Sequence, residues 1–81
     1  MTIEQLRLVL HAAPFRPFTI HLADGRQIRV PHPDFVAQSP TGRTIIIYQE
    51  DESFSIVDPL LVTELKVHNG AGAGSKRKKG G

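Results

Sequence analysis

The sequence predicts an α+β domain, in which an N-terminal helix precedes about five short antiparallel strands that form a strongly bent sheet or a small barrel. Three observations predict it. Apolar residues recur at helical spacing over residues 2–13, they alternate at strand spacing in later segments, and turn residues separate those segments at short intervals. Turns this short permit only antiparallel pairing.

The first element is a helix over residues 2–13. Thr2 and Gln5 have the spacing of a capping box, in which two side chains bond free backbone N–H groups of the first turn. Pro14 ends the helix, because the residue before a proline avoids helical angles. Leu8 lies on the polar face, where we expect an exposed side chain with no role or, alternatively, a contact with another subunit. The side of this helix that we expect to face the core carries Ile3, Leu6, Val9, Leu10 and Ala13.

The next two strands form a hairpin. Apolar and polar residues alternate over 18–23 and again over 27–30. The Asp24-Gly25 pair between them favours a two-residue type I′ turn, which needs positive φ at both positions.

Proline residues interrupt the chain after this hairpin. Neither Pro31 nor Pro33 can donate to a strand ladder, so we expect a bend or bulge there, with strand resuming over residues 34–38. A turn at Pro40-Thr41-Gly42 leads to a β-branched strand over residues 44–49.

The last strands are separated by an acidic turn and a proline turn. Residues 50–53 form the acidic turn, and residues 54–57 form the fourth strand. Asp58-Pro59 begins a tight turn or a short 3₁₀ segment through residue 61. The final strand covers residues 63–67, with Leu65 and Val67 predicted to point inward.

The chain divides into a folded domain over residues 1–69 and a linker with a basic tail over residues 70–81. The domain carries six basic and eight acidic side chains, a net charge of −2, whereas the tail adds four positive charges. The high isoelectric point, about 9.4, therefore comes from the tail. The Gly/Ala/Ser composition that precedes the charges is typical of a flexible linker.

Composition excludes several classes of protein. There is no cysteine, which rules out disulfides and thiolate metal sites. No apolar run approaches the roughly 18 residues of a membrane-spanning helix. The first residues lack the order of a signal peptide. We therefore expect a cytoplasmic protein without a membrane span.

No catalytic or metal-binding pattern is evident, and we expect neither enzyme activity nor a cofactor. The four histidines match no zinc spacing. His32 and Asp34 could bind a metal or orient a proton carrier, but we favour the interpretation that they are surface loop residues. Glu50, Asp51 and Glu52 lack the ligand spacing of a calcium loop, so we interpret them as a solvated turn.

Two segments resemble the Sm-like barrel, the architecture of RNA-binding rings. Residues 18–28, with alternating apolar residues before Asp24-Gly25, are similar to the first half of the Sm motif. Residues 56–65 resemble an Sm fourth strand, tight turn and fifth strand. The resemblance runs from about residue 2 to residue 68 and implies a small barrel behind an N-terminal helix.

The RNA-contact positions of that family are not matched. Val30 stands where Sm proteins have a glycine, Phe35 and Val36 fall where an Asp and an Asn help to form the RNA pocket, and Leu60-Leu61-Val62 replaces the basic residue and glycine before the last strand. The resemblance therefore implies an architecture and carries over no RNA-binding residue.

The whole pattern also resembles a group of short bacterial proteins of uncharacterised function. They begin Met-Thr-Ile-Glu-Gln-Leu-Arg and continue Pro-Phe-Arg-Pro-Phe-Thr-Ile-His-Leu-Ala-Asp-Gly-Arg. This resemblance implies a bacterial protein of housekeeping size.

Two hypotheses of function follow. The first is a non-catalytic, Sm-like binding module, able to form a homo-oligomer, that contacts RNA or DNA without sequence preference. Its candidate residues are Arg26, Arg29 and Arg43 on the domain and Lys76, Arg77, Lys78 and Lys79 in the tail. The alternative is a protein-interaction or scaffold module that pairs through Leu8 or an exposed strand edge.

Overall fold

The computed structural model describes residues 2–68, and within them it contains one α-helix and six strands. The α+β class is confirmed. In chain order the elements are α1 (Ile3–Leu10), β1 (Phe18–Leu22), β2 (Gln27–Val30), the 3₁₀ turn η1 (Pro33–Phe35), β3 (Val36–Gln38), β4 (Ile45–Tyr48), β5 (Phe54–Val57), the 3₁₀ turn η2 (Pro59–Leu61) and β6 (Val62–Val67).

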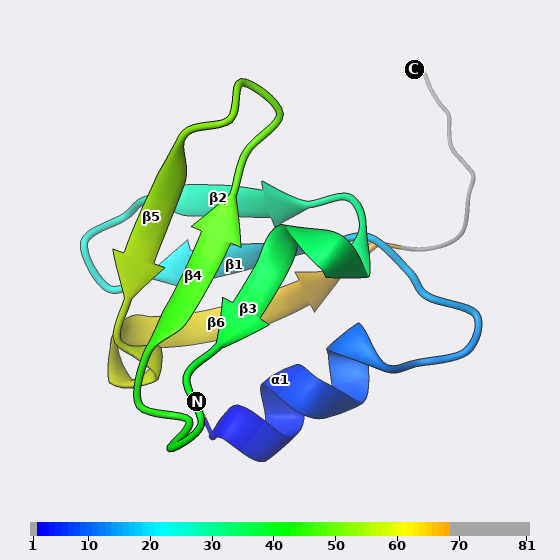
Figure 1. Cartoon of the computed structure of the whole chain (residues 1–81), viewed down its shortest axis with the longest axis horizontal. Coiled ribbons are helices and arrows are strands. Elements are labelled where there is room, and N and C mark those ends of the chain that lie inside the picture. The colour runs from blue at the N-terminus through cyan, green and yellow to red at the C-terminus, as the bar shows by residue number, and fades with distance from the viewer. Residues whose placement is uncertain (1, 69–81) are drawn as a thin grey trace.

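The strands form two antiparallel sheets of three strands each. The front sheet in Figure 1 has the order β3-β4-β5, and the rear sheet has the order β2-β1-β6. The strands of the front sheet run across those of the rear sheet, and α1 lies along the side where β3 and β6 come near each other (Figure 1). Within residues 2–68 no strand pairing joins the two sheets, so the expected small barrel is not closed.

The proline segment explains why there are six strands instead of five. The strand predicted to resume at residue 34 begins at Val36, because Pro33–Phe35 forms η1. The ring nitrogen Nδ1 of His32 accepts the Asp34 backbone N–H at 3.2 Å and caps this turn. The turn redirects the chain, so β3 pairs with β4 in the front sheet and does not continue β2.

The helix begins as predicted and ends earlier. Both bonds of the capping box between Thr2 and Gln5 are present. The helix stops at Leu10, and His11 is its C-cap, whereas the sequence predicts a helix to residue 13. Ala12 and Ala13 are exposed, so a further turn would bury little apolar surface to stabilise it.

The first hairpin forms where predicted, but its turn type differs. The Leu22 N–H donates to the Arg26 carbonyl at 2.9 Å, which leaves three residues in the loop. Only Gly25 in this loop has positive φ, at 94°, so the type I′ prediction is wrong. The β4–β5 hairpin repeats this design, with a bond from the Gln49 N–H to the Ser53 carbonyl and a positive φ of 70° at Glu52.

The core lies between the two sheets and the helix. Its buried apolar side chains are Leu6, Leu10, Phe18, Ile20, Leu22, Ile28, Val30, Ile45, Ile47, Val57 and Val62. Leu65 is half-buried, in agreement with the prediction that it points inward. Val67 is exposed, contrary to the prediction, because it lines an open hollow beside Ala12 and Ala13, where the helix has already ended. The part of the chain that the structure describes holds no helix long and apolar enough to cross a bilayer.

Candidate functional site

The outer face of the front sheet is apolar. Ile46 pairs with Ala37 on one side and with Ile56 on the other, and Tyr48 pairs with Phe54. Directly paired residues point to the same side of a sheet, so these five side chains share one face. Ile45 and Ile47, between them on β4, are fully buried on the opposite face. We call the outward group the apolar face; it consists of Ala37, Ile46, Tyr48, Phe54 and Ile56.

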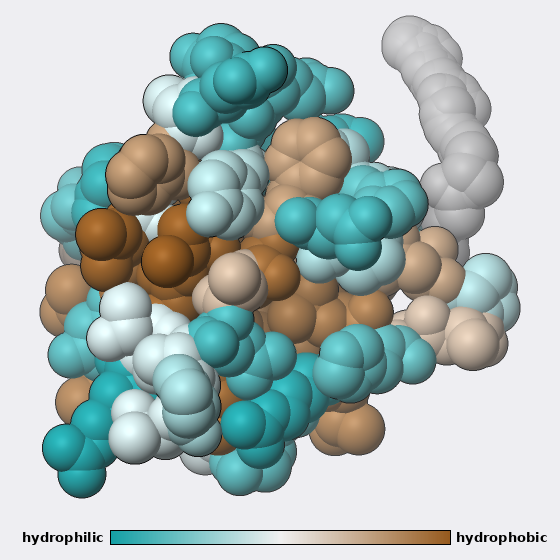
Figure 2. All heavy atoms as spheres, viewed as in Figure 1, coloured by the Kyte–Doolittle hydropathy of each residue, from teal (hydrophilic) through white to brown (hydrophobic). Residues whose placement is uncertain are grey.

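Among the large apolar residues of this face, exposure is greatest on β5, one of the two edge strands of the front sheet. Tyr48 is 43% exposed, whereas Phe54 is 57% and Ile56 is 66% exposed. The rings of Tyr48 and Phe54 lie 5.9 Å apart between centroids. Figure 2 shows the apolar side chains gathered over β4 and β5. Single exposed apolar residues are ordinary, but a contiguous group typically marks a binding surface.

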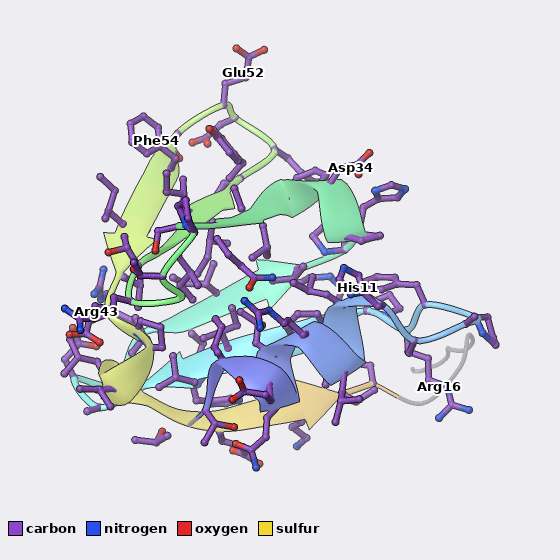
Figure 3. The ribbon with its side chains drawn as sticks, turned by 60° about the horizontal axis from the view of Figure 1, so that its bottom comes forward. His11, Arg16, Asp34, Arg43, Glu52 and Phe54 are labelled. Atoms are coloured by element: carbon purple, nitrogen blue, oxygen red, sulfur yellow. The ribbon has the colours of Figure 1, made fainter. Side chains whose placement is uncertain are left out.

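An acidic hairpin adjoins this face. Glu50, Asp51 and Glu52 are exposed, and they connect β4 to β5. Within residues 2–68 no ion pair joins any of these three carboxylates to a basic side chain. Figure 3 shows Glu52 and Phe54 projecting at the same end of the molecule.

Ser53 organises this hairpin. Asp51 Oδ1 accepts the Ser53 hydroxyl at 2.6 Å and the Ser53 backbone N–H at 3.0 Å. These bonds, the hydroxyl first, lower the pKa of Asp51 below its ordinary value of 3.8. Asp51 therefore remains ionised near neutral pH, and the hairpin presents a concentration of negative charge.

Among residues 2–68, no strand lies beside the outer edge of β5, which pairs with β4 alone. The bond from the Gln49 N–H to the Ser53 carbonyl sets the alternation of the ladder, so Ser55 and Val57 bond to β4. The backbone N–H and C=O groups of Phe54 and Ile56 consequently point away from β4, toward the open edge.

The three domain arginines predicted as nucleic-acid contacts lie in separate parts of the described surface. Arg26 Nε donates to Asp24 Oδ2 at 2.9 Å, which compensates its charge within the β1–β2 hairpin. Arg43 lines a hollow with Ile3 and Leu60. Arg29 lines a different hollow that also contains Glu50. Figure 3 places Arg43 at the opposite end of the molecule from Arg16.

The rear sheet instead brings Arg29 together with Lys66, which is not among the predicted nucleic-acid residues. Thr19 on β1 pairs with Arg29 on β2 and with Lys66 on β6, so these side chains form one row on the outer face. Thr19 Oγ1 lies 2.8 Å from His68 Nε2 in a hydrogen bond. Strand alternation already indicates that Arg29 and Lys66 point outward, but the pairing of β6 with β1 is a long-range contact that local patterns do not reveal. The other predicted nucleic-acid residues, Lys76, Arg77, Lys78 and Lys79, lie outside the described residues.

Leu8 is exposed on the helix, as predicted. Its side chain is 74% exposed and lines a hollow with Val9, Arg16 and Val67. Nothing in residues 2–68 contacts the outer part of this side chain, so its predicted role in an oligomer stays a prediction.

The histidines do not gather into a metal site. His32 Nδ1 lies 3.6 Å from Asp34 Oδ2, with both side chains well exposed. His21 Nε2 lies 3.9 Å from Glu64 Oε1 on the outer face of the rear sheet. Residues 2–68 contain no group of three or more potential metal ligands. His32 Nδ1 already accepts the Asp34 backbone N–H, so it carries no proton toward Asp34 Oδ2. Contacts of this kind at the surface are worth little in solvent.

Comparisons of this chain with protein-family models, with curated proteins and with solved structures find no match.

Proposed function

We propose that this domain is a non-catalytic protein-binding module whose docking surface is the apolar face. The observation that carries the proposal is the contiguous exposure of Tyr48, Phe54 and Ile56 across two paired strands. The interior needs none of these side chains, because the buried residues of β4 and β5 point to the opposite face. A partner that covers the face would remove this apolar surface from water.

The expected contribution of this surface to binding is substantial. Burial of a Phe or Ile side chain is worth about 1.5–3 kcal/mol relative to full exposure. Phe54 and Ile56 are partly covered already, so a partner would gain about half to two-thirds of that from each. Because the interaction is apolar, it should persist at high salt, unlike contacts between exposed charges.

The test is retention of binding partners by the immobilised full chain at high salt. Phe54→Ser combined with Ile56→Ser should abolish retention of any specific partner. Leu60→Ser combined with Leu61→Ser is the matched control, because these leucines are exposed to a similar extent, at 82% and 52%, and lie on η2. The same partners retained by both double variants, or none retained by the wild type, would contradict the proposal.

Contact with nucleic acid is the second candidate function. The row of Arg29, Thr19 and Lys66 favours it, because two exposed cations flank a hydroxyl on one sheet face. The tail residues Lys76, Arg77, Lys78 and Lys79 follow β6 in the sequence and would add four charges. Phosphate backbones bind such cations without sequence preference.

Affinity for nucleic acid measured over a series of salt concentrations tests this second candidate. If the four tail charges engage phosphates, the plot of log K against log salt should have a slope of about −3 on single strands, and Arg29 and Lys66 together should steepen it by about 1.4. Arg29→Gln with Lys66→Gln should remove that increment in a titration of mixed RNA or DNA. Arg26→Gln with Arg43→Gln is the charge-matched control. Equal slopes for the two double variants would eliminate the sheet face as a phosphate-binding surface.

An Sm-like architecture and assembly into a homo-oligomer remain part of the proposal. What supports the architecture is the order of elements, with a helix first and a last strand that returns beside β1 after a 3₁₀ turn. Leu8 on α1 is the proposed oligomer contact, because its side chain projects into solvent. The chain contains no cysteine, which is consistent with the cytoplasm as the proposed location.

A further inference from the structure

We propose that the partner is a basic, extended segment of another protein, and that it adds to the open edge of β5 as a further strand of the front sheet. This inference rests on the proposed function, since it names the partner of the apolar face. Three features of the described residues point to such a segment: the unpaired edge, the distribution of apolar exposure and the uncompensated acidic hairpin.

The outer edge of β5 presents backbone N–H and C=O groups to which another strand could bond. Phe54 and Ile56 direct their N–H and C=O groups away from β4, as the alternation set at Gln49 and Ser53 requires. An added strand would bond to these groups, and main-chain bonds of this kind supply affinity in β-strand addition. The strand has no proline and no inward-pointing charge, the features that commonly block pairing at an edge.

The apolar side chains favour the same geometry. Exposure increases from Tyr48 on β4 to Phe54 and Ile56 on β5, so the most exposed large apolar side chains of this face belong to β5. A strand beside β5 would place every second side chain next to Phe54 or Ile56 on the outer face. The partner segment should therefore carry apolar residues at alternate positions.

The charge of the partner follows from the hairpin. Glu50, Asp51 and Glu52 lie at the start of β5, and no basic side chain of residues 2–68 forms an ion pair with them. Arg29 lines the same hollow as Glu50 without reaching ion-pair distance. Lys or Arg residues at the matching end of the partner strand would face these carboxylates, whereas Asp or Glu residues there would be repelled.

The tail of this chain has the basic side chains that such a partner needs, but it lacks the large apolar ones. Residues 70–81 carry four basic side chains, but their only apolar side chains are two alanines. They could approach the hairpin electrostatically without covering Phe54 or Ile56. A basic segment from another protein, with apolar residues at alternate positions, meets both requirements.

The probes for the test are two synthetic peptides labelled with a fluorophore. Both contain the same alternating Val-Thr stretch, and one ends in Lys and Arg residues where the other ends in Glu and Asp residues. Anisotropy titrations with the full chain should show the basic peptide binding at least about tenfold more tightly at low salt, and the ratio should shrink as salt rises. Backbone amide shifts should change most at Phe54 and Ile56.

Two variants assign the effect to the edge and the hairpin. Glu50→Gln with Glu52→Gln should remove most of the preference for the basic peptide and leave Asp51 to order the turn. Glu4→Gln with Glu64→Gln is the matched control for the same loss of charge. Ile56→Pro should reduce binding of the basic peptide at least about tenfold, because proline removes an N–H that β4 does not use. If that variant does not fold, the backbone amide shifts of the wild type show whether the peptide binds at the edge of β5.

The outcomes that would overturn this inference differ from those that would overturn the proposed function. Equal binding of the two peptides, binding of neither, or shifts centred on β6 would overturn the inference. The proposed function would stand or fall separately, on whether Phe54→Ser with Ile56→Ser abolishes partner retention at high salt. Pairing of β5 with a second copy of the chain, detected as a dimer that excludes the basic peptide, would also overturn the inference.

Discussion

The two sheets of this domain have outer faces of opposite character. The rear sheet presents Arg29, Thr19 and Lys66 in one row and Gln27, His21 and Glu64 in the next, all of them polar or charged. The front sheet presents the apolar face. Both sheets are antiparallel, have three strands and contribute to the same core. An antiparallel sheet normally has one buried face and one solvated face.

The contrast indicates that the two outer faces are suited to different surroundings. The rear face is already suited to water or to a polar ligand. The front face has the composition of an interior surface, although no element among residues 2–68 covers it. A domain of about 68 residues has a small free energy of unfolding. Exposed Phe54 and Ile56 side chains do not add to that free energy, because they are not buried in the core.

The prediction with the greatest change in the free energy of unfolding compares the two faces of the front sheet. Ile47→Ala should lower the free energy of unfolding by about 2–5 kcal/mol, because this side chain is fully buried. Ile56→Ala, one position along on the neighbouring strand but outward, should change it by no more than about 0.5 kcal/mol. Urea denaturation of both variants provides the measurement. Similar losses in the two would mean that the apolar face is covered within the chain.

The second prediction compares the two hairpins, one in each sheet. Gly25 has a φ of 94° with nothing within 4 Å of an added Cβ, so Gly25→Ala should destabilise the domain by about 1 kcal/mol through the backbone alone. Glu52 occupies the corresponding loop position at a φ of 70°. Glu52→Gly should relieve that conformation and stabilise the domain by about 0.5–1 kcal/mol. Thermal unfolding of both variants measures these changes, and a loss of stability in Glu52→Gly would contradict the equivalence of the two loops.

The smallest effect concerns the aspartates of these hairpins. Hydrogen bonds lower the pKa of both Asp24 and Asp51 below 3.8, but the main cause for Asp24 is the Arg26 backbone N–H and for Asp51 it is the Ser53 hydroxyl. Ser53→Ala should therefore raise the pKa of Asp51 toward its ordinary value, whereas Arg26→Ala should change that of Asp24 less. NMR titration of the two carboxyl groups measures this difference, and equal shifts would contradict the assigned causes.

The sign of the pH dependence follows from these lowered values. A carboxyl group with a lowered pKa in the folded state contributes stability above its unfolded pKa, near 3.8, and loses that contribution as the pH falls toward the folded value. Both hairpins should therefore weaken only in acid below about pH 4. Within the physiological range, Asp51 keeps its charge.

Local signals predict much of this fold. The Thr2–Gln5 capping box, the hairpin at Asp24-Gly25 and the 3₁₀ turn after Asp58 each depend on residues within a few positions of one another. For that reason they can be recognised in a single sequence. The polar row on the rear sheet could be recognised only in part, because outward positions are local but the pairing of β6 with β1 is not.

The apolar face illustrates what local patterns leave undetermined. In the segment Phe54-Ser55-Ile56-Val57, hydrophobicity alone would place Phe54 and Ile56 inward. The structure places Val57 inward instead, because the three-residue acidic loop fixes the register that pairs Ile45 with Val57. A shift of one residue would exchange the two faces of β5. The sequence therefore predicts an exposed strand edge only in general terms and does not reveal the apolar face, because loop geometry, and not composition, determines which residues of β5 face outward.

The most direct test of the docking surface is site-specific photo-crosslinking in the cells that make the protein. A photoreactive amino acid replaces Ile56 on the apolar face in one variant and Gln27 on the outer face of the rear sheet in another. Position 56 should give a discrete crosslink to another protein, and position 27 should give none. Crosslinks of equal yield from both positions, or none from position 56, would contradict the assignment of the apolar face as a binding surface.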